Sequence, residues 1–381
     1  MLDKKYIRYY LSGYLNMYFS NLAFSYKSSS GSYKQYKIIE TLLYAGFRDI
    51  KRDLSWLSPF LCLFEAILST IIVSARFLYI ATKVLFLKKY IYNDQIFVAS
   101  LIIASFRLKG MLSQIRPKEV STLKIPFIKN EYSENEVDIL KALSIANICQ
   151  AFAYSFRTIW IQYKKYRNRD LFFRSYSSFE YYLTCSFVSR METNNSFLFY
   201  NTYDRWAFLM CNTTKSIFIQ HGKLPETMRL IKIGTPKTAY YITKKQGVVL
   251  ENILFDGIPT ERNYRNSLVF TSNELLLHNE KKNVLLVCWS HNIAIEWEIC
   301  KLLSPISNLY IKPHPGDKDN PDYPLMSEKY NAIIIPKTGY PQVDVVVSYD
   351  STLADEYENV DIKVIRYDLL ENLNDLVGKL D

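Results

Sequence analysis

Short apolar runs alternate with polar, helix-like stretches in the second half of the chain. Six such runs occur, at 196–200 (SFLFY), 216–220 (SIFIQ), 284–290 (VLLVCWS), 308–312 (NLYIK), 332–335 (AIII) and 343–348 (VDVVVS). They are continuously apolar rather than alternating, as expected of strands buried on both faces of a parallel sheet. Strands that alternate with helices predict an α/β fold.

The first half of the chain has a different pattern. Residues 1–125 and 138–190 contain long apolar segments with few Gly or Pro, which predicts helices, whereas 126–137 is polar and predicts a loop. A change of pattern near 265–282 precedes a fresh set of strands. We therefore predict an N-terminal domain over 1–265, helical to 190 and α/β from about 191, and a C-terminal domain over 266–381.

The most apolar stretch runs from Leu54 to Leu87. Within it, Ser58 and Pro59 form an N-cap followed by a first-turn proline, which predicts that a helix starts there. A membrane span needs about 20 largely apolar residues, and charges interrupt this stretch about every ten residues. A buried core helix, a bilayer span, and a helix lying on a membrane all fit the pattern. The last would turn its basic residues toward the lipid head groups: Arg76, Lys83, Lys88 and Lys89.

Composition excludes several classes of protein. The 381 residues are 49% hydrophobic and 22% charged, which excludes disordered and low-complexity chains. The six cysteines include no CxxC pair, and the 11 glycines include no GxGxxG or P-loop pattern. We expect a reducing compartment, no signal peptide and no Gly-rich cofactor loop.

Charge is shared unevenly between the halves. Residues 1–190 carry 27 Lys and Arg against 13 Asp and Glu, whereas 191–381 carry 20 against 24. A basic first half suggests an anionic partner, namely a membrane surface, nucleic acid or a phosphorylated substrate, or else a solvated basic surface. The sequence has no helix-turn-helix, RRM or zinc-finger signature, so we expect no nucleic-acid partner.

Three of the four histidines directly follow a predicted strand. They are His221 after SIFIQ, His291 after VLLVCWS and His314 after LYIKP, and a fourth strand ends in the segment Ser348 to Thr352. Ligands of open α/β sheets bind outside the carboxyl ends of the strands. These polar strand ends therefore predict one cleft, although any single histidine can equally be a surface or core residue.

The residue types at these strand ends suit a phosphate. Ser351 and Thr352 precede a helix-like segment, whose first backbone N–H groups bind anions. His314, between two prolines, can donate a hydrogen bond to a phosphate oxygen, and Glu356 one turn later can reach ribose hydroxyls. His221 suits a general base for an acceptor hydroxyl. There is no HExxH motif, so we expect no metal site.

The order of these motifs resembles bacterial surface-polysaccharide transferases of the GT-B fold. The resemblance covers about 196–370 and rests on five segments: Gln220-His221-Gly222, Gly257-Ile258-Pro259 with Arg262, the strand ending at Ser290, Lys312 to Pro315, and Ser348 to Thr352. Two branches share this layout. One contains CDP-glycerol glycerophosphotransferases of teichoic-acid synthesis. The other contains capsule and lipooligosaccharide transferases that use CMP-activated sugars of the sialyl, polysialyl or Kdo type.

The resemblance assigns roles to individual residues. His221 would be the base, with Asp256 before Gly257 as the second catalytic candidate, because sialyltransferases of this group often use an acidic pair before a glycine. The acceptor side would hold Gln220, Gly222 and Arg262. The nucleotide side would hold Ser290, His291, Lys312, His314, Ser348, Ser351, Thr352 and Glu356.

The sequence as a whole predicts a GT-B-like transferase with two Rossmann-like domains facing a cleft. It would move a CMP-linked sugar onto a glycan or lipid-linked glycan by inverting displacement, with no cofactor beyond the donor. We expect it in the cytoplasm, at the anionic inner face of the membrane. The alternatives are a CDP-glycerol or CDP-ribitol phosphotransferase and a non-catalytic, membrane-associated assembly protein.

Overall fold

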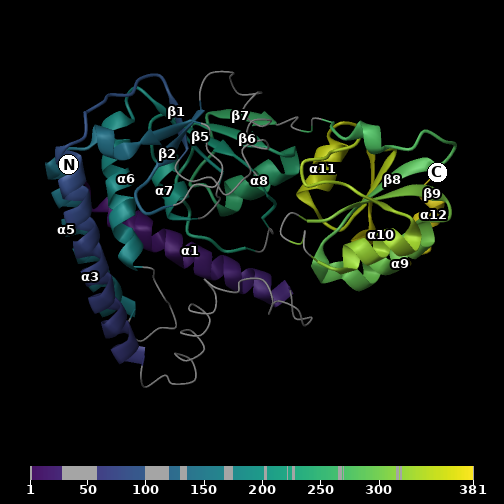
Figure 1. Cartoon of the computed structure of the whole chain (residues 1–381), viewed down its shortest axis with the longest axis horizontal. Helices are drawn as coiled ribbons and strands as arrows, with labels where there is room; N and C mark the ends of the chain where they lie inside the picture. The colour runs from purple at the N-terminus through teal and green to yellow at the C-terminus, as the bar shows by residue number, and fades with distance from the viewer. Residues whose placement is uncertain are drawn as a thin grey trace.

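The chain forms two parallel β-sheets, each covered by helices (Figure 1). This computed structural model describes residues 2–27, 58–98, 120–128, 135–166, 175–200, 204–220, 222–224, 228–264, 268, 270–314, 317 and 320–380. The first sheet has the order β3 (Glu136–Asp138), β2 (Val120–Lys124), β1 (Ile96–Val98), β4 (Ser196–Phe199), β5 (Ser216–Ile219), β6 (Thr238–Tyr241), β7 (Glu261–Tyr264). The second has the order β10 (Ile333–Ile334), β9 (Ser307–Lys312), β8 (Lys282–Val287), β11 (Val345–Ser348), β12 (Lys363–Arg366).

Both sheets follow the doubly wound Rossmann order. The chain begins in the middle of each sheet, adds two strands to one side, and then returns to extend the other side. All neighbouring strands are parallel. The order reverses between β1 and β4 in the first sheet and between β8 and β11 in the second, and such switch points open a crevice at the carboxyl edge. The predicted α/β fold with two Rossmann-like units is confirmed.

All six apolar runs form strands, and the region before residue 191 is largely helical, as predicted. That region also contributes β1, β2 and β3. They have three to five residues. Neighbouring strands and helices supply their burial, so their conformation depends on tertiary contacts more than on a local pattern. The strands of the two sheets lie on either side of 265–281; the domain boundary at 265/266 itself stays a prediction.

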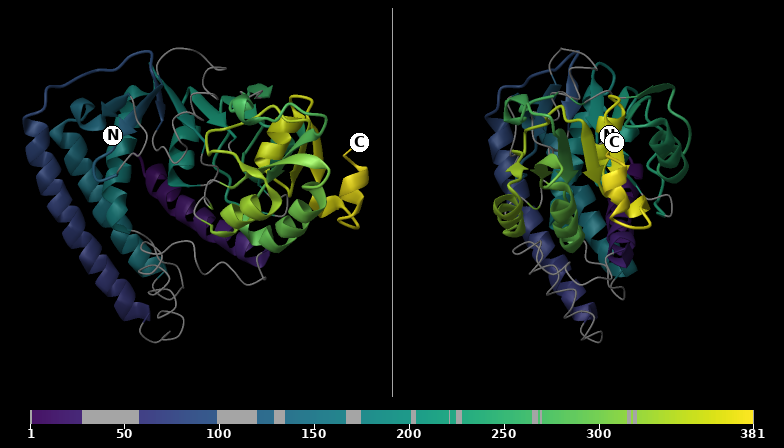
Figure 2. Two further views of the ribbon diagram at one scale, coloured as in Figure 1. Left: turned by 45° about the vertical axis from the view of Figure 1, so that its right-hand side comes forward. Right: turned by 90° about the vertical axis from the view of Figure 1, so that its right-hand side faces the viewer.

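Helices cover both sheets. The first unit holds α1 (Lys5–Lys27), α3 (Ser58–Leu85), α5 (Ile145–Tyr166), α6 (Ser178–Met191), α7 (Arg205–Cys211) and α8 (Lys244–Ile253). The second holds α9 (Ile293–Leu303), α10 (Asp322–Tyr330), α11 (Thr352–Glu358) and α12 (Asp375–Gly378). Within the first unit, α3 packs along α5, α5 packs on α6, and α1 packs on α7 (Figure 2). Helix α3 begins at Ser58, as the Ser-Pro signal predicts.

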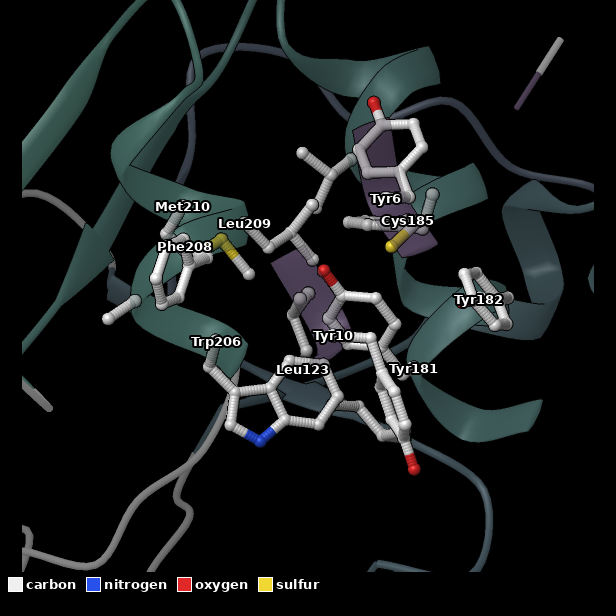
Figure 3. Close-up of a cluster of buried hydrophobic side chains, with 14 of the residues drawn as sticks. Tyr6, Tyr10, Leu123, Tyr181, Tyr182, Cys185, Trp206, Phe208, Leu209 and Met210 are labelled. Carbon is white, nitrogen blue, oxygen red and sulfur yellow. The ribbon is translucent and has the colours of Figure 1, made fainter. Parts of the chain in front are cut away.

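Aromatic side chains fill the core between α1, α6 and α7 (Figure 3). The Tyr10 ring lies 5.2 Å from that of Tyr181, which lies 5.6 Å from Trp206. A buried tyrosine hydroxyl needs a hydrogen-bond partner. The Tyr10 hydroxyl lies 3.2 Å from Ser177 Oγ, and the Tyr182 hydroxyl lies 2.6 Å from Thr158 Oγ1. Several of the 31 tyrosines of the chain therefore help to build this core.

Arg76 lies on the inner side of α3, and its predicted place toward lipid head groups is wrong. Its guanidinium pairs with Glu180 of α6 and donates to the carbonyl of Tyr176 at 3.1 Å. Residues Ser69, Val73 and Ile80 share this face because they lie three, four or seven positions away, and all three are buried. Burial raises the pKa of Glu180 to about 7 against the opposing effect of Arg76.

The close contact between α1 and α7 at Gly13 predicts the effect of one substitution on stability. An alanine Cβ at Gly13 would lie 2.3 Å from the backbone nitrogen of Arg205. Because backbone atoms of α7 cannot move aside, we expect Gly13→Ala to destabilise the protein by about 1–3 kcal/mol or more, measured by urea unfolding. Gly378→Ala is the control, since a Cβ at Gly378 meets nothing within 4 Å. Equal unfolding midpoints for the two variants would contradict this packing.

Candidate functional site

Polar and aromatic residues follow four strands of the second sheet at its carboxyl edge. Trp289 and His291 come after β8, His314 after β9, Tyr349 after β11, and Tyr367 after β12. Because parallel strands point the same way, these segments share one edge of the sheet. The switch point between β8 and β11 therefore lies between Trp289 and Tyr349.

The side chains at this switch point form a cluster that we call the aromatic shelf: Trp289, His291, Tyr349 and Tyr367. The Trp289 and His291 rings are stacked, with centroids 4.5 Å apart and planes 28° apart. Tyr349 lies 6.3 Å from Trp289 and 5.8 Å from Tyr367. Trp289 remains 39% exposed. A planar, partly exposed aromatic surface at a switch point can stack on a flat ring such as a nucleobase.

A buried carboxyl group accepts hydrogen bonds from two residues of the aromatic shelf. Glu296 of α9 has no solvent exposure, and its Oε1 accepts hydrogen bonds from the Trp289 backbone N–H at 2.6 Å and the Tyr367 hydroxyl at 3.4 Å. Burial raises its pKa to about 7, although these donors act in the opposite direction. Glu296 therefore fixes the turn that follows β8.

The segment after β11 starts a helix, as the sequence predicts. Ser351 is the N-cap of α11, and its Oγ accepts a hydrogen bond from the Ala354 backbone N–H at 3.0 Å. The Ser348 hydroxyl, which is buried, donates to Ser351 Oγ at 3.0 Å. Thr352 opens the helix, and Glu356 is buried within it. Two of the predicted phosphate-binding hydroxyls are thus engaged with each other and with the helix end.

Lys312 and His314 follow the same strand but differ in their surroundings. The Lys312 ammonium donates to the carbonyls of Pro336, Lys337 and Gly339 at 2.6, 2.9 and 2.7 Å. These bonds use its three donors, which favours a structural role over the predicted nucleotide contact. His314 is exposed, and its carbonyl accepts from the backbone N–H of Asp317 at 2.8 Å, which closes a turn.

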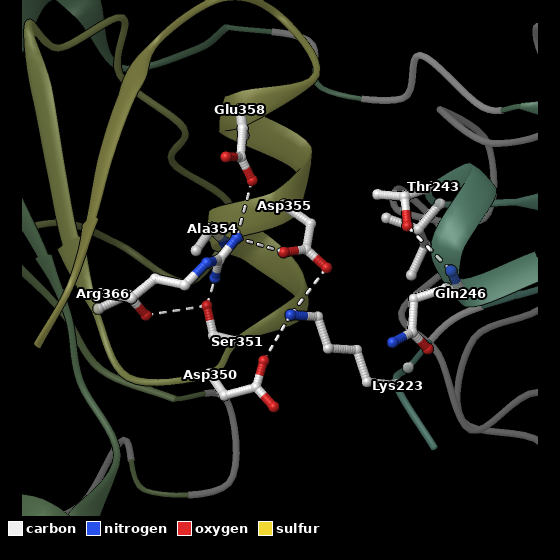
Figure 4. A network of polar contacts seen from close by, with 12 residues as sticks. Lys223, Thr243, Gln246, Asp350, Ser351, Ala354, Asp355, Glu358 and Arg366 are labelled. Atoms are coloured by element: carbon white, nitrogen blue, oxygen red, sulfur yellow. Dashed lines mark hydrogen bonds and ion pairs between the residues drawn. The ribbon is translucent and has the colours of Figure 1, made fainter. Parts of the chain in front are cut away.

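Lys223 links the two units at their carboxyl edges (Figure 4). It follows β5, and its Nζ lies 2.6 Å from Asp350 Oδ1 and 2.8 Å from Asp355 Oδ2 in the second unit. Arg366 holds Asp355 from the other side at 2.5 Å and Glu358 at 2.8 Å. Burial alone would lower the pKa of Arg366, but these two carboxylates raise it above its usual value.

A second contact joins the two units. The Asn359 side chain, at the end of α11, donates to the carbonyl of Ile242 after β6 at 2.8 Å. Gln220, which is buried after β5, accepts from the Ile242 N–H at 3.0 Å and donates to Gly222 O at 3.0 Å. The carboxyl ends of β5 and β6 therefore face β11 and α11 across the junction.

Several predicted site residues lie elsewhere or outside the described part of the chain. His221 lies outside the described residues, and of Ser290 only the backbone is described, at the start of η5 (Ser290–Asn292). Asp256 is exposed and precedes β7, so it lies at the amino edge, opposite Lys223, and the structure does not support its catalytic role. Its backbone N–H donates to Gly234, which precedes β6. Arg262 lies in the edge strand β7 and faces Glu251 at 3.7 Å rather than Gln220.

Lys223, Trp289 and Glu296 belong to the candidate site, but their roles depend on the fold and do not follow from the motifs. Lys223 had a usable signal, since it follows a predicted strand by three residues in Gln220-His221-Gly222-Lys223. Trp289 and Glu296 had none, because one is the end of an apolar run and the other belongs to an ordinary helix. Within the described residues, no group of three or more His, Cys, Asp or Glu is placed to hold a metal ion.

Comparisons with known proteins give weak structural similarity and no sequence match. No family model and no curated protein match the sequence. Among solved structures, the wall teichoic acid polymerase TagF, in a crystal soaked with CDPG, aligns with 82% of this chain and 78% of its own at 12% identity and a TM-score of 0.38. A similarity at this level identifies neither a reaction nor a substrate.

The buried carboxyl of Glu296 predicts a pH-dependent stability. Its pKa is about 7 in the folded state and near 4.5 when unfolded. Its contribution to stability is therefore full below about pH 4.5 and is lost as the pH rises through about 7. This loss amounts to about 3 kcal/mol. We expect Glu296→Gln to remove this pH dependence in urea unfolding between about pH 5 and 8.

The neighbouring acid Glu298 provides the control. It is exposed on the same helix, so Glu298→Gln should keep the wild-type pH dependence. An unchanged pH profile in Glu296→Gln would show that the carboxyl ionises as readily in the folded chain as in the unfolded one.

Proposed function

We propose that this chain is a transferase of surface-polysaccharide synthesis that uses a nucleotide-activated donor, and that the donor nucleotide binds on the aromatic shelf. The donor we favour is a CMP-linked sugar of the sialic-acid or Kdo type, and the acceptor a hydroxyl of a glycan or lipid-linked glycan. The donor is a substrate, so no further cofactor is required. We place the reaction in the cytoplasm.

The observation that carries the proposal is the aromatic shelf at the β8–β11 switch point. Four rings from three strand ends meet there, and Trp289 leaves part of its face open to solvent. Crevices at switch points are the usual ligand sites of doubly wound sheets. Stacking of a base on an aromatic ring contributes about 1–3 kcal/mol, enough to favour a nucleotide at this place.

The junction supports a donor and an acceptor on opposite sides of one site. Lys223 and Gln220 belong to the carboxyl edge of the first sheet, whereas Asp350 and the aromatic shelf belong to that of the second. The ammonium of Lys223 reaches the loop after β11, so a cation from the acceptor side lies close to the donor side.

The proposed reaction is an inverting displacement. The acceptor hydroxyl attacks the anomeric carbon, the bond from that carbon to the CMP phosphate oxygen breaks, and CMP leaves with the bonding electrons. The base takes the hydroxyl proton. His221 is our candidate, because it stands between Gln220 and Gly222 in the sequence, directly after the strand whose end faces the second unit.

Two alternatives differ in chemistry from this proposal. In a CDP-glycerol or CDP-ribitol phosphotransferase, the acceptor hydroxyl attacks the phosphate that carries the polyol, and CMP again leaves. A non-catalytic assembly protein would turn over no donor. Measuring whether CMP is released from a CMP-linked sugar, from CDP-glycerol or from neither therefore distinguishes the three functions.

Nucleotide binding is the first test. We expect CMP to bind more tightly than UDP in calorimetry, and Trp289→Ala to weaken CMP binding about tenfold or more because it removes the stacking face. The Trp289 backbone N–H that Glu296 holds is kept in this variant. Phe86→Ala, which changes an exposed ring outside the second unit, should bind CMP as the wild type does.

Two calorimetric results would count against the proposal. Undiminished CMP binding by Trp289→Ala would move the nucleotide away from the aromatic shelf. Absence of binding to CMP, CDP and UDP alike would favour the non-catalytic protein.

Turnover tests the assignment of the base. We expect wild type to release CMP from CMP-sialic acid or CMP-Kdo, and His221→Ala to lose at least about a hundredfold in kcat while its affinity for CMP stays within about twofold. Near-normal kcat in His221→Ala would remove His221 as the base. CMP release from CDP-glycerol alone would replace sugar transfer by polyol-phosphate transfer.

A further inference from the structure

Helix α3 has a long apolar face that is exposed to solvent. Its residues recur every three, four or seven positions along the helix, so they form one stripe: Phe60, Phe64, Ile67, Ile71, Leu78 and Leu85. Ile71 is 60% exposed and Leu78 is 64% exposed. Isolated exposed apolar residues are normal, but a continuous stripe along a helix of about 42 Å marks an interaction surface.

The charges of α3 avoid this stripe. Glu65 Oε1 accepts from the Ser175 backbone N–H at 3.4 Å, and Arg76 pairs with Glu180, so both face the protein. Lys83, in the last turn, is exposed. The three charges that interrupt the apolar sequence therefore leave the outer face uncharged from Phe60 to Thr82.

The ends of α3 are flanked by cations. Helix α5 runs antiparallel to α3, because the Phe77 and Phe152 rings meet at 4.6 Å while Lys89, beyond the end of α3, contacts the carbonyl of Leu143 before the start of α5. Exposed Lys83 and Lys88 thus lie at one end of α3, and exposed Lys164, near the end of α5, lies toward the other. Helix α5 carries Arg157, Lys164 and Lys165 and no acidic residue.

We propose that the outer face of α3, with the neighbouring part of α5, docks on the surface of an anionic lipid bilayer. The apolar stripe would enter the boundary between head groups and acyl chains, and the lysines at both ends would meet anionic head groups. The absence of exposed carboxylates on the two helices, within their described residues, makes the face complementary to negative charge.

The helix lies along the membrane plane and does not cross it. By length and composition, the segment Cys62–Leu85, with mean hydropathy 1.7, is the one candidate span among the described residues. However, its inner side is packed on α5 and holds the Arg76–Glu180 pair. Insertion across the bilayer would carry α5, with its three cations, into the hydrocarbon, at a high cost in solvation free energy.

Vesicle co-sedimentation tests this proposal on the full chain. We expect binding to vesicles of phosphatidylcholine with phosphatidylglycerol, weaker binding to phosphatidylcholine alone, and a decrease at high salt. Ile71→Asp combined with Leu78→Asp should lower the bound fraction at least tenfold. Leu369→Asp, a control at a 72% exposed leucine of the second unit, should bind as the wild type does.

A second double variant tests the contribution of the lysines, and the oligomeric state tests whether a second copy of the chain covers the stripe. Lys83→Glu combined with Lys88→Glu leaves the apolar stripe intact and should reduce the preference for anionic vesicles, because the cations of α5 remain. Full vesicle binding by the double aspartate variant, or no binding by the wild type, would overturn the proposal. So would a wild-type dimer that the aspartates convert to a monomer, because a second copy would then cover the stripe. CMP affinity should stay unchanged in all variants, so the outcome is separable from the proposed function.

Discussion

The common direction of the strands determines where this molecule can have a site. Parallel strands require crossover connections, so helices cover both faces of each sheet, and the strand ends gather polar segments on one edge. Both sheets here repeat the Rossmann order, and their carboxyl edges meet at the junction where Lys223 pairs with Asp350 and Asp355. The aromatic shelf, the N-cap of α11 and the ion pairs all follow from this orientation.

Burial raises the pKa of two carboxyl groups in this chain, although each has a partner that stabilises its charged form. Glu180 has a guanidinium beside it and Glu296 has hydrogen-bond donors, yet the pKa of each is raised to about 7. Loss of solvation therefore exceeds the stabilisation that either kind of partner gives to the charged form. One carboxyl connects α3 to the core of the first unit, and the other fixes the turn that positions Trp289.

A structural element can be predicted from the sequence when the interactions that determine it lie within a few residues of each other. Strands that coincide with continuous apolar runs, such as β8 and β11, and the Ser351 cap are encoded within a few residues, and the sequence predicts them. Short strands such as β1 owe their conformation to neighbours far along the chain, and the pairing of Lys223 with Asp355 joins residues 132 positions apart. Asp256 shows the limit of motif spacing, since only the topology reveals that it lies at the opposite edge from Lys223.

The ion pairs of Lys223 connect the two units through contacts that water can reach unequally. Asp350 is 50% exposed, whereas Asp355 is 7% exposed and also holds Arg366. Dissolved ions screen the first of these attractions far more than the second. The two ion pairs across the junction therefore respond differently to salt. The Lys223–Asp350 attraction weakens as ionic strength increases, whereas the Lys223–Asp355 attraction changes less.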